Sequence, residues 1–166
     1  MLEDAILATD LAVYFRRRAE TFSLISSGNL QWDAGEERHR SLLRGAMMTA
    51  CDLAAITKPW KIQKQVARLV SAEFFYQGDL ERSQLNLQPI DMMDRDKMDK
   101  LPAMQVDFID AICMPVYDAF AGLSENLLPL KRGCEANRVE WAALARQAEE
   151  NKENRRKKEE QKEDRH

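Results

Sequence analysis

Residues 61–77 of this 166-residue chain read KIQKQVARLVSAEFFYQ, and their apolar side chains recur at intervals of three or four positions. That spacing is the period of an α-helix, in which such positions fall on one face. The predicted apolar face comprises Ile62, Val66, Leu69, Val70 and Phe74. We therefore predict an amphipathic helix here, and we expect it to end at Gly78 because glycine favours the C-terminal caps of helices.

The same period continues toward the N-terminus. Apolar residues from Leu7 to Ile25 predict a single helix that ends near Gly28. A further helix is expected over residues 36–56, because its apolar residues are again spaced by three or four. Pro59 stops that helix, since proline lacks an amide hydrogen and restricts the residue before it.

Toward the C-terminus, residues 89–97 are charged and aperiodic and indicate a loop. Pro102 suits the first turn of another helix, which we expect to run to about Gly122 and to bend at Pro115. No stretch shows the sustained alternation of apolar and polar residues that is typical of strands. The sequence therefore predicts an all-α fold of about six or more helices, as expected for one domain of this size.

Composition limits the kind of partner. The hydrophobic share of 45% is sufficient for a core, and the net charge of −3 gives no field that would attract nucleic acid. Three separate cysteines suggest neither a zinc cluster nor a disulfide framework. No apolar run is long enough to span a membrane. We expect a cytoplasmic protein that does not bind nucleic acid and does not span a membrane.

The last part of the chain has a different composition. Residues 149–166 are almost purely polar and charged, so they cannot bury a core. We predict one domain, or part of one, over residues 1–148, followed by a tail at 149–166 that is a frayed helix or disordered. A basic tail that binds a partner is the alternative interpretation.

Carboxylates stand out where apolar residues are expected. Thr9 and Asp10 interrupt the first apolar stripe, and Asp52 follows an uncharged stretch of the second expected helix. A buried carboxylate needs a cation, a metal or several hydrogen-bond donors. Asp52 therefore has two interpretations, as an acceptor of local hydrogen bonds or as a ligand of a hard metal ion.

Gln105 and Phe108 share one helical face at a spacing of three residues. A glutamine amide suits the donor and acceptor edge of a purine, and a phenylalanine ring stacks on its plane. The pair is also compatible with an exposed amide beside a core aromatic residue. Only two histidines are present, His39 and His166, so no His/Asp cluster and no Ser-His-Asp set can be assembled within the chain.

From about Ala5 to Gln147, the chain resembles the class I 3′,5′-cyclic-nucleotide phosphodiesterases. The similarity is greatest to the GAF-containing cGMP-specific enzymes, their photoreceptor relatives and the dual-specificity branch. The stretches that carry it, in order, are ILATDL (6–11), MTACDL (48–53), ITKPW (56–60), EFF (73–75), QGD (77–79), ER (81–82), MQV (104–106) and FID (108–110).

The resemblance implies a base pocket. Gln105 would read the purine, and Phe108 and Val70 would clamp it from opposite sides. Gln63 would hydrogen-bond Gln105, with Trp141 packed near that network, although a helical glutamine more often faces water. The remaining lining residues implied by the resemblance are Leu53, Ala55, Ile56, Phe74 and Met104.

The resemblance also implies a two-metal centre of zinc and magnesium, with Asp52 as a carboxylate ligand and Thr9 near the metal-bound waters. The family's histidine motifs lie upstream of the position that matches Ile6 and are not among these residues. Only part of the centre is therefore expected here, and the chain alone is expected to be inactive. Asp107 departs from the glycine of the cGMP-specific relatives.

The expected activity of the parent enzyme is hydrolysis of cGMP to 5′-GMP in cyclic-nucleotide signalling, with cAMP as a second candidate substrate. A homodimer of the parent enzyme is also expected from the resemblance. The alternative is a catalytically inactive helical module that derives from a phosphodiesterase and pairs with a full-length subunit.

Overall fold

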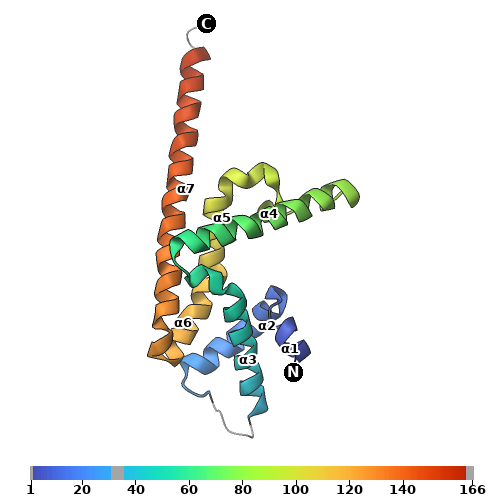
Figure 1. Ribbon diagram of the computed structural model, residues 1–166, viewed down its shortest axis with the longest axis vertical. Coiled ribbons are helices and arrows are strands. Elements are labelled where there is room, and N and C mark those ends of the chain that lie inside the picture. The colour runs from blue at the N-terminus through green and yellow to red at the C-terminus, as the bar shows by residue number, and fades with distance from the viewer. Residues whose placement is uncertain (1, 31–35, 164–166) are drawn as a thin grey trace. The chain divides into compact units, whose positions relative to one another are not determined.

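A computed structural model describes residues 2–30 and 36–163, and helices joined by turns account for all of its regular structure (Figure 1). The predicted all-α fold is confirmed across these residues, while His166 lies outside them. The α-helices are α1 (Leu2–Leu7), α2 (Leu11–Ser26), α3 (Glu37–Asp52), α4 (Trp60–Gln84), α5 (Leu101–Phe108), α6 (Met114–Leu123) and α7 (Leu128–Glu163). Short turns are η1 (Leu53–Thr57), η2 (Asp91–Met93), η3 (Arg95–Lys100), the π-helical η4 (Ile109–Cys113) and η5 (Glu125–Leu127).

The chain divides into two compact units, which we describe separately. The first unit comprises residues 1–59 and 109–135, and the second comprises residues 60–108 and 136–166. None of the helices that the structure describes is long and apolar enough to cross a membrane.

The core of the first unit joins α3 to α6. The hydroxyl of Tyr117 donates to the carbonyl of Ala50 at 2.8 Å, and the hydroxyl of Thr49 donates to the carbonyl of Ala8 at 2.9 Å. Cys113 and Cys134 are fully buried in this core, whereas Cys51 is exposed. Burial raises the pKa of the Cys134 thiol to about 12, so both buried cysteines are protonated components of the core.

The single helix expected from Leu7 to Ile25 is wrong. The structure ends α1 at Leu7 and begins α2 at Leu11, with Asp10 as the N-cap. The carboxylate of Asp10 accepts from the amide of Ala12 at 2.8 Å, which satisfies a donor that the first turn leaves free. The acidic residue that interrupts the apolar stripe is thus a helix cap.

The other expected boundaries of the first unit agree better with the structure. Helix α2 ends at Ser26, and Gly28 follows with a φ of 67°, a left-handed conformation that glycine adopts without steric cost. The helix expected over residues 36–56 is shorter, because α3 ends at Asp52 and a 3₁₀ turn continues to Thr57.

The irregularity expected at Pro115 takes the form of the π-helical turn η4, directly before α6. Proline cannot donate to the carbonyl of Ala111, its partner in a regular helix. A guanidinium nitrogen of Arg18 donates to that carbonyl at 3.4 Å, and the Tyr14 hydroxyl donates to the neighbouring Ile112 carbonyl at 3.5 Å. Side chains of α2 therefore supply donors to the carbonyls of the irregular turn.

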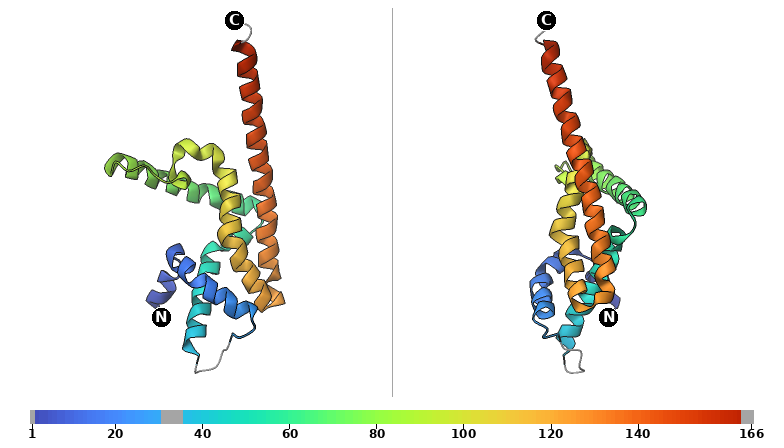
Figure 2. Two further views of the ribbon diagram at one scale, coloured as in Figure 1. Left: turned by 180° about the vertical axis from the view of Figure 1, so that it is seen from behind. Right: turned by 90° about the vertical axis from the view of Figure 1, so that its left-hand side faces the viewer.

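In the second unit, α4 continues past Gly78 to Gln84, so the expectation that Gly78 ends the helix is wrong. Gly78 is buried within the helix, and a Cβ atom added to it would lie 2.1 Å from the carbonyl oxygen of Met93. Figures 1 and 2 show the segment between α4 and α5 folding back over α4. Glycine is needed at this position because the returning backbone approaches the helix so closely.

Replacing Gly78 by alanine is expected to destabilise the protein by about 1–3 kcal/mol, because the new methyl group forces the Met93 backbone away. Gly122→Ala in α6 is the matched control, since nothing lies within 4 Å of a Cβ atom there. The control should be neutral or slightly stabilising, by at most about 1 kcal/mol. Thermal and urea unfolding of both variants measures the difference. Equal stability of the two variants would contradict the proposed close contact.

The charged tail continues α7 as a helix through Glu163. Its described side chains are exposed, and one ion pair joins Glu153 to Lys157 at 2.7 Å along the helix. Such exposed pairs contribute little stability individually. Whether residues 149–166 form a separate segment in solution stays a prediction.

Candidate functional site

A buried polar pair in the second unit is the most specific feature among the predicted site residues. Gln63 is 3% exposed and Trp141 is 2% exposed, although α4 and α7 carry them 78 residues apart. The indole Nε1 of Trp141 donates to Oε1 of Gln63 at 2.9 Å. The structure thus contradicts the alternative in which Gln63 faces water.

This hydrogen bond determines the orientation of the Gln63 amide. An indole N–H donates and cannot accept, so the atom of Gln63 that faces it must be the oxygen. The Nε2 group of Gln63 therefore points away from Trp141, and both of its protons are left for other acceptors. Gln63 can therefore donate a hydrogen bond to a group on the side of its amide that faces away from Trp141.

Trp60 supports the pair, and sequence reasoning gave it no role. Its ring packs edge-on against Trp141, with centroids 5.0 Å apart and planes at 82°. The ammonium of Lys64 lies 5.2 Å from the centroid of the Trp60 ring. Trp60, in the ITKPW stretch, could have been singled out from the sequence, because a large aromatic residue at the start of a helix commonly packs against a neighbouring element.

Two other predicted pocket residues share the face of α4 that carries Gln63. Val70 and Phe74 follow it by seven and eleven residues, which places each within about 20° of Gln63 around the helix axis. Exposure varies along this face, because Gln63 is buried, Val70 is 42% exposed and Phe74 is half-buried. The prediction that Val70 belongs to the buried apolar face of the helix is therefore wrong. An exposed valine with a buried amide on the same face suits the wall of a binding site.

Helix α5 carries Met104, Gln105 and Phe108, all half-buried. The side-chain amide of Gln105 makes no hydrogen bond with any residue that the structure describes, so the expected bond from Gln63 is absent and the amide is available to a ligand. The Asp107 side chain is exposed to solvent. Pro102 begins this helix as predicted, since it stands in the first turn, where no intrahelical amide bond is needed.

The first unit holds the remaining predicted lining residues. Ile56 is 5% exposed, and Leu53 and Ala55 are half-buried in the same 3₁₀ turn, η1. This turn packs against η4 within the first unit. The structure therefore groups Leu53, Ala55 and Ile56 with one another, and Gln63 with Trp141.

Asp52 is exposed at the end of α3, so the prediction of a carboxylate in an apolar core is wrong. Among the apolar residues of α3, Leu42 and Leu43 are buried, whereas Met47 and Cys51 are exposed. Thr9 is half-buried in the turn after α1, and its hydroxyl donates to the carbonyl of Ile6 at 2.8 Å. Thr9 is thereby occupied in a local turn.

A metal centre does not fit these residues alone. Within residues 2–30 and 36–163, no three His, Cys, Asp or Glu side chains gather closely enough to hold an ion. A catalytic metal needs at least three protein ligands, and Asp52 supplies only one carboxylate. We therefore derive no step of a reaction through a metal.

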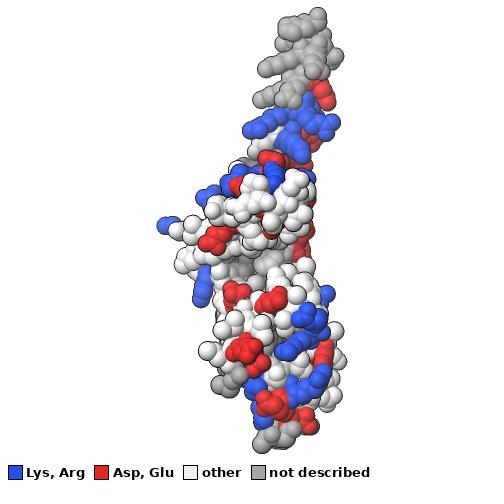
Figure 3. Space-filling model, turned by 90° about the vertical axis from the view of Figure 1, so that its right-hand side faces the viewer, with Lys and Arg blue, Asp and Glu red and all other residues white. Residues whose placement is uncertain are grey.

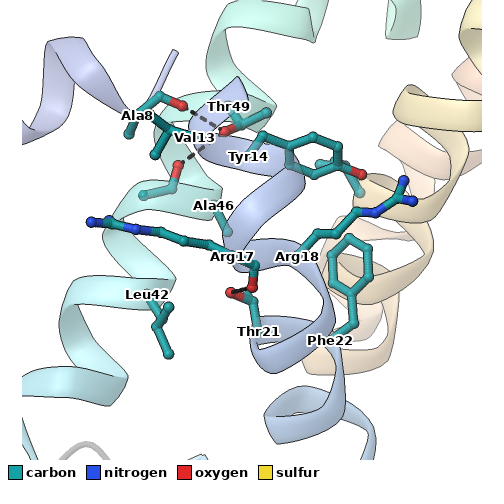
Figure 4. Close-up of a pocket in the computed structure, with 12 residues that line it drawn as sticks. Ala8, Val13, Tyr14, Arg17, Arg18, Thr21, Phe22, Leu42, Ala46 and Thr49 are labelled. Atoms are coloured by element: carbon teal, nitrogen blue, oxygen red, sulfur yellow. Dashed lines mark hydrogen bonds between the residues drawn. The ribbon is translucent and has the colours of Figure 1, made fainter. Parts of the chain in front are cut away.

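A small hollow between α2 and α3 in the first unit is not a ligand site (Figure 4). Its volume of about 20 Å³ holds little more than one water molecule, whereas ligand pockets occupy several hundred Å³. Figure 4 shows the Thr49 hydroxyl directed toward the Ala8 carbonyl beside it. The hollow is a gap in helix packing.

Charge is mixed on one face of the molecule. On the face drawn in Figure 3, Lys and Arg side chains of the described residues are interspersed with Asp and Glu. This mixture agrees with the net charge of −3 for the whole chain. This face therefore offers no broad field for a polyanion.

Comparison with known proteins places these features in a family. The sequence profile described as 3'5'-cyclic nucleotide phosphodiesterase matches residues 1–134. A "Dual 3',5'-cyclic-AMP and -GMP phosphodiesterase 11" of Drosophila melanogaster is 57% identical over 145 residues, which are 87% of this chain and 10% of that protein. A "cGMP-specific 3',5'-cyclic phosphodiesterase" of Drosophila virilis is 51% identical over 148 residues, which are 89% of this chain and 16% of that protein. The chain thus spans only 10 to 16% of the length of these relatives.

Proposed function

Because this chain belongs to the 3′,5′-cyclic nucleotide phosphodiesterase family, we propose that it supplies the base-binding part of an enzyme that hydrolyses cGMP to 5′-GMP. We include cAMP as a second substrate, since the similar proteins are named as cGMP-specific and as dual enzymes. In this reaction water adds to phosphorus and the P–O3′ bond breaks, which leaves a 5′-monophosphate and a free 3′-hydroxyl.

The buried hydrogen bond between Trp141 and Gln63 is the observation that best supports a base-reading role. Gln105 would present its amide to the purine edge, while Phe108 and Val70 would enclose the ring. Gln63, with its oxygen already bound, would donate to Gln105 and so select one orientation of that amide. Leu53, Ala55, Ile56, Phe74 and Met104 would exclude water around the base.

Divalent metals are used by this family. We propose zinc and magnesium as the metals, with Asp52 as one ligand and Thr9 near the bound waters. The other ligands would have to come from outside the described residues, because these hold no cluster of three suitable side chains. We also propose a cytoplasmic enzyme and a homodimer, which the family resemblance supports.

The test is direct hydrolysis by the full-length protein in which this chain occurs. Purified protein with zinc and magnesium should convert cGMP to 5′-GMP, and the polypeptide of residues 1–166 alone should not, since it offers too few ligands for a metal. Product formation is followed by chromatography. A full-length protein without turnover would contradict the proposed activity, and turnover by residues 1–166 would contradict the proposed incomplete centre.

A second candidate is a catalytically inactive helical interaction module. Apolar side chains of α1 and α3 favour it, because Leu2, Ile6 and Met47 are 79%, 64% and 49% exposed. Exposed apolar groups on neighbouring helices are typical of interaction surfaces. An inactive full-length protein that forms a stable complex with an active phosphodiesterase subunit would favour this candidate.

A further inference from the structure

A single carboxylate organises the segment that connects α4 to α5, which we call the strap (residues 88–100). Asp94 is 3% exposed, and its Oδ1 atom accepts from Arg82 Nη2 at 2.8 Å and from the amide of Asp96 at 3.1 Å. Its Oδ2 atom accepts from Gln88 Nε2 at 3.3 Å, with the ammonium of Lys97 at 4.0 Å. A buried carboxylate persists only with such partners.

Burial by itself would raise the pKa of Asp94, but the Asp96 amide, the Arg82 guanidinium and the Lys97 ammonium outweigh it and lower the pKa. Asp94 is therefore ionised at neutral pH. Arg82 also contacts the exposed Asp96 through its other nitrogen, at 3.3 Å. The guanidinium of one α4 residue thus holds two carboxylates of the strap.

Further contacts hold the strap against α4. Arg95 donates to Asp79 at 2.7 Å, and its guanidinium carbon lies 5.7 Å from the centroid of the Phe75 ring. Gly78 leaves space for the carbonyl of Met93, as described above. The strap is therefore fixed to three consecutive turns of α4 by charge, by an aromatic contact and by close backbone packing.

The strap leads directly into α5. Turns η2 and η3 both contact α4, and η3 continues directly into α5, since Lys100 is followed at once by Leu101. Gln63 and Val70 stand on α4, whereas Gln105 and Phe108 stand on α5. The spacing between the two helices that carry the proposed base pocket consequently depends on how the strap is anchored.

We propose that Asp94, held by Arg82, is a positioning residue that sets the placement of α5, and with it Gln105 and Phe108, against α4. The inference rests on the proposed function for its consequence in catalysis, but its structural part is independent of hydrolysis. Asp94 contacts no substrate. It acts through the strap on Gln105 and Phe108, which would contact the substrate.

Asp94→Asn tests the proposal in the full-length protein. Asparagine keeps the size of the side chain and the acceptor for the Asp96 amide, so the variant removes chiefly the charge. Hydrogen exchange of the amides of residues 101–108 should accelerate roughly tenfold, because α5 loses its anchor. KM for cGMP and cAMP should rise roughly tenfold while kcat changes less than about twofold, as expected when substrate binding is weakened.

Asp118→Asn is the matched control, since it also removes one carboxylate from an ion pair, with Lys131 at 2.7 Å in the first unit. It should leave the exchange of residues 101–108 and KM unchanged. Arg82→Gln provides a second variant that leaves Asp94 in place and should reproduce both effects of Asp94→Asn. Circular dichroism identifies a variant that fails to fold, in which case the other variant decides.

Unchanged exchange of residues 101–108 in the folded Asp94→Asn and Arg82→Gln variants would overturn the proposal, whatever the kinetics. A fall in kcat at unchanged KM would also overturn it, because that pattern indicates loss of active enzyme. If the wild-type protein hydrolyses neither nucleotide, the proposed function fails, and the exchange measurement still decides the role of Asp94.

Discussion

Gln105→Ala is expected to lower kcat/KM for cGMP and for cAMP alike, each by roughly 100- to 1,000-fold. The amide would make two hydrogen bonds to either purine, and each is worth about 1.5–2 kcal/mol when its loss leaves a polar group of the base unpaired. Gln105 has no hydrogen-bond partner among the described residues, so its removal should not disturb the fold. Initial rates with both nucleotides, measured on the full-length enzyme, give the two ratios.

Gln65→Ala is the control for this variant, because Gln65 is an exposed glutamine of the second unit with no proposed role. It should retain the wild-type kcat/KM for both substrates. Both variants should unfold at the wild-type temperature. A Gln105→Ala enzyme with unchanged kcat/KM for cGMP would show that Gln105 does not read the base.

Gln63→Ala is expected to have a different effect, namely a smaller difference between the kcat/KM values for cGMP and cAMP. In the wild type, the Trp141 indole holds the Gln63 oxygen, which leaves Nε2 to donate. We propose that Nε2 donates to Gln105 when a nucleotide is bound; without that donor the Gln105 amide would be free to rotate, and its donor and acceptor pattern would then suit either purine. The ratio of kcat/KM for cGMP to kcat/KM for cAMP should move toward unity by a factor of roughly 10 to 100, equivalent to about 1–3 kcal/mol.

Trp141→Phe separates the effect of the orientation of the Gln63 amide from the effect of the presence of that side chain. This variant retains Gln63 but removes the N–H that distinguishes its oxygen from its nitrogen, so the ratio should again move toward unity. Gln65→Ala serves once more as the control on α4. An unchanged cGMP/cAMP ratio in both Gln63→Ala and Trp141→Phe would exclude this pair from substrate selection.

The contrast between Gly78 and Pro102 shows what the sequence could predict. Pro102 begins a helix for a local reason, the missing amide hydrogen, and its position was predicted correctly. Glycine is needed at position 78 for a tertiary reason, because the Met93 backbone approaches the helix there, and the spacing of residues in the sequence does not indicate such a contact. Local propensity suggested a helix end, but the strap explains why glycine is needed inside the helix.

The exposure of Asp52 and the burial of Asp94 also could not be predicted from residue spacing. Asp52 attracted attention because its sequence neighbours are uncharged, yet it is exposed. Asp94 lies in a charged stretch that indicated a loop, yet it is 3% exposed, with Arg82 as its partner from another element. Burial of a charge depends on partners that are distant in sequence, and periodicity carries no information about them.

Gln63 is the case in which family resemblance contributed what spacing could not. Its position on the face of Val70 and Phe74 follows from the helical period. Its burial depends on Trp141, a contact over 78 residues. The resemblance named both residues as parts of one network, and the hydrogen bond between them supports that implication, while their role in substrate selection stays a prediction.

The unequal burial of the three cysteines makes the protein suitable for selective chemical labelling. Thiolates, not thiols, react with maleimides, and burial keeps Cys113 and Cys134 protonated and out of contact with solvent. Cys51 is exposed and directly precedes Asp52. Within this chain, a fluorescent maleimide should therefore attach at Cys51, where its emission would report on the surroundings of the proposed metal ligand.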